Sequence, residues 1–268
     1  MSTLRTKTEA TTGLSSITGI GSANLSRYAN SFDGNTANYL SRASGTEFDH
    51  GGKFTIAAWV KVPNVSGIKV IAGRWQNSAA NRDWFIKVDN NDFQALVYGA
   101  GGVAFSTGEI ANTIVANTWY FLCLAFDDQL GSSNEMTMFK TDENNTATET
   151  DFTQRLTNNG GGGAAFGIGR VEGGATAFNG EIGPVLYWHD LRINTAQFEW
   201  LANSGNGRGF SEINSSADAN NPGSTNLMYW QLHEPSGSTR ADCGSGGYDL
   251  TVNGSVPRTT GHVAEETC

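Results

Sequence analysis

The alternation of apolar and polar positions along the chain predicts β-strands. In the segment 53–62, KFTIAAWVKV, five apolar side chains share one side of an extended chain: Phe54, Ile56, Ala58, Val60 and Val62. The other side carries Thr55, Ala57, Trp59 and Lys61. Because successive side chains of a strand point to opposite faces, this two-residue period indicates a strand in the core of a sheet.

Two later segments are apolar on both faces. These are 118–126, TWYFLCLAF, and 180–188, GEIGPVLYW. Burial on both faces is typical of central strands in stacked sheets. Pro184 interrupts the second segment, and since proline has no N–H to donate to a neighbouring strand, we expect an edge or a bulge at that point.

Three shorter segments are separated by short polar connections. They are 68–75, 84–88 and 93–98, and their spacing predicts an antiparallel meander. We expect the strands at 104–110, 118–128 and 135–142 to continue it. The chain therefore reads as nearly all β.

One helix is predicted after residue 193. Asn194 and Gln197 have the spacing of a capping box, and Gly205 supplies a stop. Phe198, Leu201 and Ala202 share one face of this helix, which we expect to plug one end of the molecule. Residues 205–225 then read as a long loop, and 226–232 as another strand.

Composition narrows the class of protein. The 268 residues are 38% apolar and include 34 glycines, and no apolar run approaches the roughly 18 residues that span a bilayer. The net charge of −9 leaves no basic stripe for a phosphate backbone, and it opposes binding to anionic membranes. We therefore expect neither nucleic acid nor a membrane as a partner.

The two ends of the chain differ from its centre. Residues 1–27 are rich in Thr, Ser and Gly and predict an arm, either floppy or ordered only against a neighbour. They contain no apolar signal region, so we expect a protein of a virion, or one released after lysis, with the cytoplasm as the alternative. Cys123 reads as a small buried hydrophobe. Cys243 and Cys268 could pair, but without a secretory signal we expect that they do not.

Five short motifs in order resemble the laminin G-like, concanavalin A-like jelly-roll family of environmental bacteria and their phages. They lie at Phe32–Leu40, Phe54–Lys61, Trp119–Asp127, Phe178–Ile182 and Leu201–Gly207. The resemblance covers residues from about 30 to 210. It implies an all-β, two-sheet antiparallel jelly-roll sandwich with one short helix, which we assign to residues 28–268 as a single domain.

The order of the family's motifs is changed at one point. The unit that usually begins the family, Y-W-x-L-x-E-x-S-G-x3-D followed by L-T-x-N-G, resembles residues 229–242 and 250–254 here. Because the termini of a domain often lie close together, residues 226–268 could return to the position of the missing first strand. We expect 226–232 to pack in cis, and the alternative is that this strand completes a neighbouring subunit.

The sequence offers weak candidates for a calcium site. Residues 180–185 lack the acidic pair that relatives carry at this point, which puts a site borrowed from the family in doubt. Asp89, Asp92, Asp127 and Asp128 could supply oxygen ligands, but they lack the spacing of a calcium loop. We interpret them as residues of turns and expect no cofactor.

Catalysis finds little support in the chain. Relatives of this fold include glycoside hydrolases, whose paired carboxylates typically follow the pattern Glu-x-Asp-x-x-Glu. Glu47 and Asp49 begin this pattern, but Gly51 and Gly52 follow and the second Glu is missing. Histidines 50, 189, 233 and 262 have no metal-ligand spacing and accompany no nucleophile motif. We therefore expect no catalytic residues and no enzyme.

One loop has the residue types that bind a sugar, namely aromatic platforms beside groups that hydrogen-bond hydroxyls. The candidates for this glycan patch are Trp75, Asn77, Asn81, Arg82 and Trp84. The alternative is that both tryptophans pack at strand ends beneath an ordinary polar loop.

Two functions from different classes remain. The first is a non-enzymatic phage virion decoration or fibre component, which contacts other copies of itself or other virion proteins through its arm and tail. The second is a carbohydrate-binding module or adhesin that binds host glycans. From the sequence alone we rank the structural role first.

Overall fold

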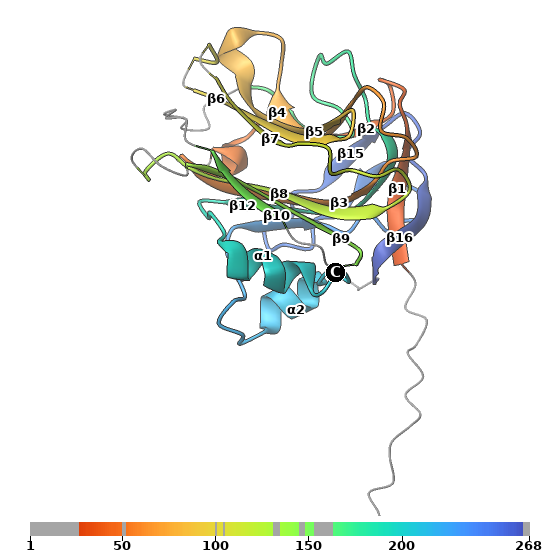
Figure 1. The fold of residues 1–268 in the computed structure, drawn as a ribbon. Helices are drawn as coiled ribbons and strands as arrows, with labels where there is room; N and C mark the ends of the chain where they lie inside the picture. Colours follow the sequence, from red (N-terminus) through yellow and green to blue (C-terminus); the bar gives the residue numbers. More distant parts are fainter. Residues whose placement is uncertain are drawn as a thin grey trace, which may run out of the picture.

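The computed structural model describes residues 27–49, 52–99, 101–103, 105–130, 135–144, 148–152 and 163–264, with only the backbone path for residues 148, 149, 151, 152 and 264. The predicted arm up to residue 26, His50, the glycines at 160–162 and Cys268 lie outside this part of the chain. The described residues form two stacked antiparallel sheets of eight strands each (Figure 1).

The first sheet, called the helix-covered sheet, contains the segments with two apolar faces. Its strands run in the order β10 (Thr148–Phe152), β9 (Met136–Asp142), β8 (Trp119–Asp127), β3 (Lys53–Lys61), β12 (Asn179–His189), β1 (Arg27–Asp33) and β16 (Arg258–Ala264), with β13 (Leu227–Trp230) also paired to β12. Strands β3, β8 and β12 are thus central, as their sequences predict.

The second sheet, called the meander sheet, contains the predicted meander at one end. Its strands run in the order β14 (Thr239–Arg240), β15 (Leu250–Asn253), β2 (Tyr39–Arg42), β11 (Phe166–Ile168), β4 (Ile68–Trp75), β5 (Arg82–Asp89), β6 (Asp92–Tyr98) and β7 (Phe105–Ile110). The expected continuation of this meander is confirmed for 104–110, which forms β7 beside β6. It is wrong for 118–128 and 135–142, because the chain leaves the sheet after β7 and enters β8 in the other sheet.

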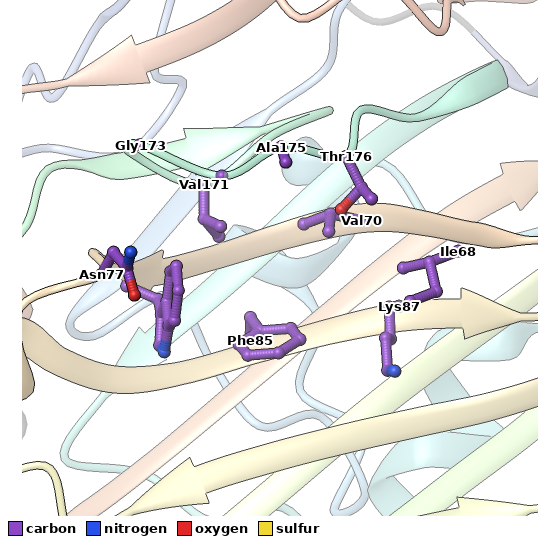
Figure 2. A pocket seen from close by; sticks show the side chains of 11 residues that line it. Ile68, Val70, Asn77, Phe85, Lys87, Val171, Gly173, Ala175 and Thr176 are labelled. Carbon is purple, nitrogen blue, oxygen red and sulfur yellow. The ribbon is translucent and has the colours of Figure 1, made fainter.

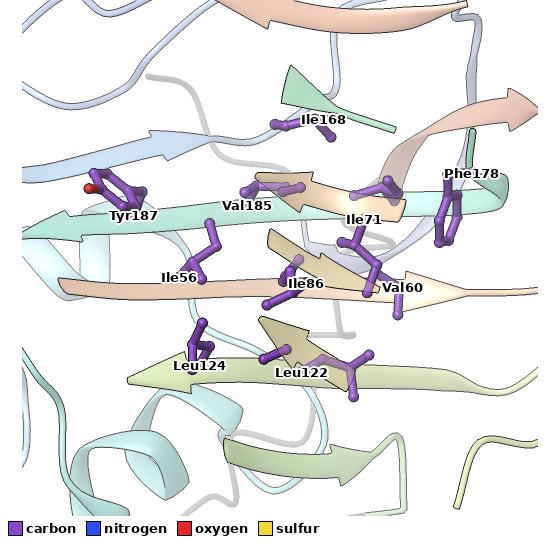
Figure 3. Packing of buried hydrophobic residues seen from close by; sticks show 14 of the residues in the cluster. Ile56, Val60, Ile71, Ile86, Leu122, Leu124, Ile168, Phe178, Val185 and Tyr187 are labelled. Atoms are coloured by element: carbon purple, nitrogen blue, oxygen red, sulfur yellow. The ribbon is translucent and has the colours of Figure 1, made fainter. Parts of the chain in front are cut away.

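The main core fills the space between the sheets. Ile56 and Val60 of β3 and Leu122 and Leu124 of β8 face the meander sheet, where Ile86 belongs to the same buried cluster (Figure 3). These side chains have at most 1% of their surface exposed. Because burial of apolar surface is the dominant favourable term in folding, this layer holds the two sheets together.

A second apolar cluster lies on the outer face of the helix-covered sheet, beneath α1 (Thr195–Ala202) and α2 (Phe210–Ser215) (Figure 1). The capping box of Asn194 and Gln197 is confirmed. The predicted place of the helix at one end of the molecule is wrong. Phe198 stacks on Phe121 and Phe139 with ring centroids 5.4 and 5.0 Å away, because the outward faces of β8 and β9 are also apolar.

Three further expectations are corrected or refined. The segment 205–225 is not only a loop, since it contains α2. Helix α1 ends at Ala202 and is capped by Asn203, whose φ of 50° is left-handed, before Gly205 is reached. Pro184 lies in a central strand, where the register between β12 and β3 shifts between Ile182 and Val185. The bulge is confirmed and the edge position is wrong.

The carboxyl-terminal segment adds strands to both sheets of its own chain. Strand β13 pairs with β12, β15 with β2, and β16, which the sequence did not predict, with β1. Cys243 in this segment is disulfide-bonded, contrary to expectation, while its proposed partner Cys268 lies outside the described residues. Cys123 is free and fully buried, and burial raises the pKa of its thiol.

Two short 3₁₀ helices complete the described elements. They are η1 (Thr46–Phe48) and η2 (Ala79–Asn81). The second lies in the connection between β4 and β5, so it joins the two strands that carry the predicted glycan patch. No helix in the described part of the chain has the length and apolar character needed to cross a membrane.

Candidate functional site

The two tryptophans of the predicted glycan patch lie on opposite faces of the meander sheet. Trp84 is fully buried between the sheets, where its ring stacks on Tyr187 at 5.6 Å and on Phe54 at 5.1 Å. It therefore cannot serve as a surface platform, and its place in the patch is corrected. Trp75 is half-buried and lines a hollow on the outer face of the sheet.

This hollow has a volume of about 290 Å³ and is the candidate functional site. Strand β5 contributes Phe85 and Lys87, and β4 contributes Val70 and Trp75. Figure 2 shows Phe85 and Lys87 on one side and Val171, Gly173, Ala175 and Thr176 on the other. The last four belong to the connection between β11 and β12, here called the wall loop (residues 171–176).

The floor of the hollow depends on a glycine. A Cβ atom on Gly73 would lie 2.3 Å from Cβ of Phe85, far closer than two carbon atoms can approach. The absence of a side chain at Gly73 lets the Phe85 ring lie over β4 and meet Trp75 edge to face, with centroids 6.0 Å apart. The two rings form one continuous apolar surface.

The wall loop is fastened to the sheet by Glu172. Its Oε2 accepts a hydrogen bond from the backbone N–H of Ala165 at 2.8 Å, and its Oε1 accepts one from Nε2 of Gln76 at 3.0 Å. Arg170 donates from Nε to the carbonyl oxygen of Gly174 at 3.0 Å. These bonds join the loop both to β11 and to the end of β4, so the wall and floor are fixed relative to each other.

Polar groups stand at the rim of this apolar surface. Asn77 is exposed, Thr176 lies on the wall, and Lys87 pairs through Nζ with Oδ2 of Asp89 at 2.7 Å. Amide, hydroxyl and ammonium groups can donate hydrogen bonds, and the first two can also accept them. An aromatic floor with a few polar groups at its rim is the usual composition of a small-ligand site.

Arg82 and Asn81 support the site from the side. The Arg82 guanidinium lies 5.7 Å from the Trp75 ring centroid and donates to the carbonyl oxygen of Asn77 at 3.4 Å. Asn81 donates from Nδ2 to Oε1 of Gln76. Of the five predicted patch residues, Trp75 and Asn77 line the hollow, Arg82 and Asn81 lie beside it, and Trp84 is in the core.

The calcium candidates have protein partners of their own. Asp89 pairs with Lys87, and Asp92 accepts from the backbone N–H of Asn112 at 2.7 Å. Asp127 pairs with Lys53 at 3.2 Å, and Asp128 has a hydrogen bond with the side chain of Gln129. Within the described ranges, no group of three or more His, Cys, Asp or Glu residues gathers as a metal site.

The carboxylates and histidines that were considered for catalysis also have positions in the structure. Glu47 pairs with Arg42, and Asp49 pairs with the buried Arg74 at 3.0 Å. His189 contacts Asp190, whereas His262 is buried beside the ring of Trp59. The hollow itself is lined by neither Asp nor Glu.

Two smaller hollows lie elsewhere on the molecule. One of about 250 Å³ lies beside the Lys61–Glu181 ion pair, between β3 and the start of β12. The other, of about 130 Å³, lies over β2 and β11 on the far side of Glu172. The first is lined by one aromatic residue, the buried Phe32, and the second by Tyr39 and the fully buried Phe166, so neither presents two accessible rings as Trp75 and Phe85 do.

Sequence reasoning missed Phe85, Lys87 and the wall loop. Strict alternation in 84–88 was a usable signal, since Trp84, Ile86 and Val88 fall on one face and Phe85 and Lys87 on the other. Because all three residues of the first set are apolar, the alternation predicts that this set faces the core and that Phe85 and Lys87 face outward. The wall loop had no comparable signal, because it lies about 90 residues further along the chain.

Comparison with known proteins identifies the family to which the fold belongs. Residues 33–192 match the family model of the concanavalin A-like lectin/glucanases superfamily. None of the curated proteins compared with the chain matches its sequence significantly.

Two solved structures resemble most of the chain. One is a candidate carbohydrate binding protein from Bacteroides ovatus, with a TM-score of 0.56 and 16% identity over 88% of this chain and 60% of that protein. The present chain thus spans less than two thirds of that protein. The other is a heptameric SAP-like pentraxin from Limulus polyphemus, with a TM-score of 0.55 and 11% identity over 89% of this chain and 97% of the pentraxin. At these identities the likeness concerns the fold alone.

Proposed function

The chain belongs to the concanavalin A-like lectin/glucanase superfamily, and we propose that it binds a saccharide in the hollow of the meander sheet without cleaving it. The observation that carries this proposal is the aromatic floor of Trp75 and Phe85 beneath the polar rim of Asn77, Lys87 and Thr176. The candidate carbohydrate binding protein with a similar fold supports it.

The chemistry of a sugar ring fits this arrangement. A pyranose presents C–H groups on its faces and hydroxyl groups around its edge. The C–H face can lie on the Trp75 and Phe85 rings, where burial of apolar surface contributes about 25 cal/mol per Å². The hydroxyls can then exchange hydrogen bonds with Asn77 and Thr176 and accept one from Lys87.

The absence of acid and base groups from the lining supports binding over hydrolysis. A glycosidase places two carboxyl groups roughly 5 to 10 Å apart on either side of the bond that it cleaves. No residue that lines the hollow carries a carboxylate. The nearby carboxylates of Glu172 and Asp89 are held by Gln76 with Ala165 and by Lys87, respectively.

The narrower role expected from the sequence, a decoration or fibre component of a phage particle, we rank below saccharide binding. It would use the arm, which lies outside the described residues, and the tail, whose strands pair within their own chain. A virion protein can also bind host glycans, so the two roles are compatible. Location in a virion or outside the cell remains part of this proposal.

A glycan array followed by calorimetry tests the proposed function. We expect the full-length protein to bind one class of glycan and Trp75→Ala and Asn77→Ala each to weaken that binding. Asn77 is exposed, so its substitution leaves the fold intact. Val115→Ala, at an exposed position outside the lining, is the control. Absence of binding to any glycan, or release of sugar products on incubation, would overturn the proposal.

A further inference from the structure

We infer that the binding surface continues beyond the hollow across β5, β6 and β7, so that the ligand is an oligosaccharide chain and not a single terminal sugar. This inference rests on the proposed function. It is drawn from a row of four side chains, one from each strand of the meander, at the end of the sheet where Trp75 lies.

The row runs from the hollow to the edge of the sheet, and its member on β6, Tyr98, is only 8% exposed and supports its neighbours from within. The guanidinium carbon of Arg82 on β5 lies 5.7 Å from the Trp75 ring centroid and 5.9 Å from the Tyr98 ring centroid on β6. The Tyr98 ring in turn lies 5.5 Å from the ring of Phe105 on β7. Neighbouring strands are about 4.8 Å apart, so four strands extend the surface over about 14 Å, longer than one sugar ring.

Strand alternation places this row on the outer face. On β6, Phe93, Ala95 and Val97 point into the core between the sheets, so Tyr98 points away from it. On β7, Ile110 points into the core and Phe105 lies on the opposite face. The row therefore shares its face with the Phe85 ring and the hollow.

Arg82 supplies hydrogen-bond donors in the middle of the row. Its guanidinium is held over two rings, and one Nη donates to the Asn77 carbonyl oxygen at 3.4 Å. Its Nε is removed from solvent and has no hydrogen-bond partner among the described residues. A guanidinium has five N–H donors and no acceptor, so it suits a ligand rich in acceptor oxygens.

Phe105 supplies an apolar platform at the far end. It is 52% exposed although it is one of the most apolar residue types. Ile68, at the opposite side of the hollow, is also exposed. Trp75 and Phe105, the accessible rings on either side of Arg82, suit successive sugar rings with hydroxyls between them.

The test compares ligand length with the Phe105→Ala variant. Calorimetry would use gluco-, galacto- and manno-oligosaccharides of one, two, four and six units. We expect the wild type to bind four units more tightly than one. Because Phe105→Ala removes the apolar surface on which the distal sugar would be buried, it should lower the ratio of four-unit to one-unit affinity by about 5-fold or more. Val115→Ala, whose side chain is exposed outside the row, should keep the wild-type ratio.

Three other outcomes would contradict the inference, and the measurements distinguish them. Equal affinity for all lengths, with binding lost in Trp75→Ala and unaffected in Phe105→Ala, would overturn the extended surface and leave the proposed function standing. A change in sedimentation coefficient in Phe105→Ala, without a change in saccharide affinity, would assign the row to contact between copies. Absence of saccharide binding by the wild type would overturn both proposals.

Discussion

The side chain of Arg240 donates from Nε to Oδ1 of Asn30 at 2.8 Å and joins the carboxyl-terminal segment to the first strand of the fold. Both residues are buried. Asn30 also donates from Nδ2 to the carbonyl oxygen of Leu232 at 3.2 Å, and Arg240 donates from Nη2 to that of Val256 at 2.7 Å. One polar cluster thus ties β1 to three separate points of the tail.

Asn30→Ala should destabilise the protein, because it removes the acceptor of a buried charged group. Hydrogen bonds to charged groups contribute about 1.5–3 kcal/mol, and we expect a loss of this size in the free energy of unfolding measured in urea. Arg240→Met in the Asn30→Ala background should cost less than in the wild type. Additive losses would show that the two side chains act independently. Glu109→Gln, at an exposed position, serves as the control.

The position of β13 predicts a protein that is folded as a single chain. Strand β13 pairs with β12 of its own chain over Val185–Trp188, and β16 covers β1. In dilute solution we expect a sedimentation coefficient of a monomer and an unfolding midpoint that does not change with protein concentration. A midpoint that rises with concentration, together with a dimer whose subunits exchange slowly, would favour strand addition in trans.

Substitutions of the two tryptophans of the predicted patch should have different effects, one on stability and the other on saccharide binding. Trp84→Phe removes part of a fully buried ring, so we expect a loss of roughly 1–3 kcal/mol in the free energy of unfolding. Its saccharide affinity should stay within 2-fold of the wild type, since Trp84 does not line the hollow. Trp75→Ala should show the reverse pattern. Loss of saccharide binding in a folded Trp84→Phe protein would contradict this division.

The wall loop should depend on Glu172. Glu172→Ala removes the acceptor for both Gln76 and the backbone N–H of Ala165, so the loop loses its link to β4 and β11. We expect saccharide affinity to fall by about 10-fold, with a loss of about 1 kcal/mol in stability. Glu172→Gln should recover part of the affinity because it retains one acceptor oxygen. Glu212→Ala on α2, far from the loop in the fold, should have no effect on binding.

His262 predicts a loss of stability in mild acid. It contacts the ring of Trp59 at 4.3 Å, and its Nε2 meets the carbonyl oxygen of Gly205. Burial lowers the pKa of His262, and the positive charges of Arg27 and Lys61 lower it further, while the contacts with Gly205 and Glu143 oppose the shift. The imidazole is therefore favoured in its neutral form in the folded state.

The sign of the effect follows from this lowered pKa. Below about pH 6.5 the unfolded chain binds a proton at this position, whereas the folded chain does so only at lower pH. The unfolded state then binds more protons, so the stability of the wild type should fall between about pH 7 and pH 5.5. His262→Gln should reduce this dependence in urea titrations at the two pH values. An unchanged dependence in the variant would assign the effect to other groups.

The sequence by itself determined the local features, because they depend on neighbours within a few residues. Alternation over 53–62 placed Ile56 and Val60 on one face, and the spacing of Asn194 and Gln197 set the start of α1. Apolar residues on both faces of β8 indicated a central strand. In each case the pattern reflects the geometry of one strand or one helix turn.

Only the tertiary structure decided which strands share a sheet and that α1 covers the outer face of the helix-covered sheet. It also decided that Trp75 and Trp84 lie on opposite faces of the meander sheet. The register between β4 and β5 shifts between Arg74 and Trp75, which no local pattern reveals. The hollow joins Phe85 to Val171, about 90 residues away in the chain. Such contacts depend on how distant strands pair, and that is settled by burial of the whole core and not by the preference of any single segment.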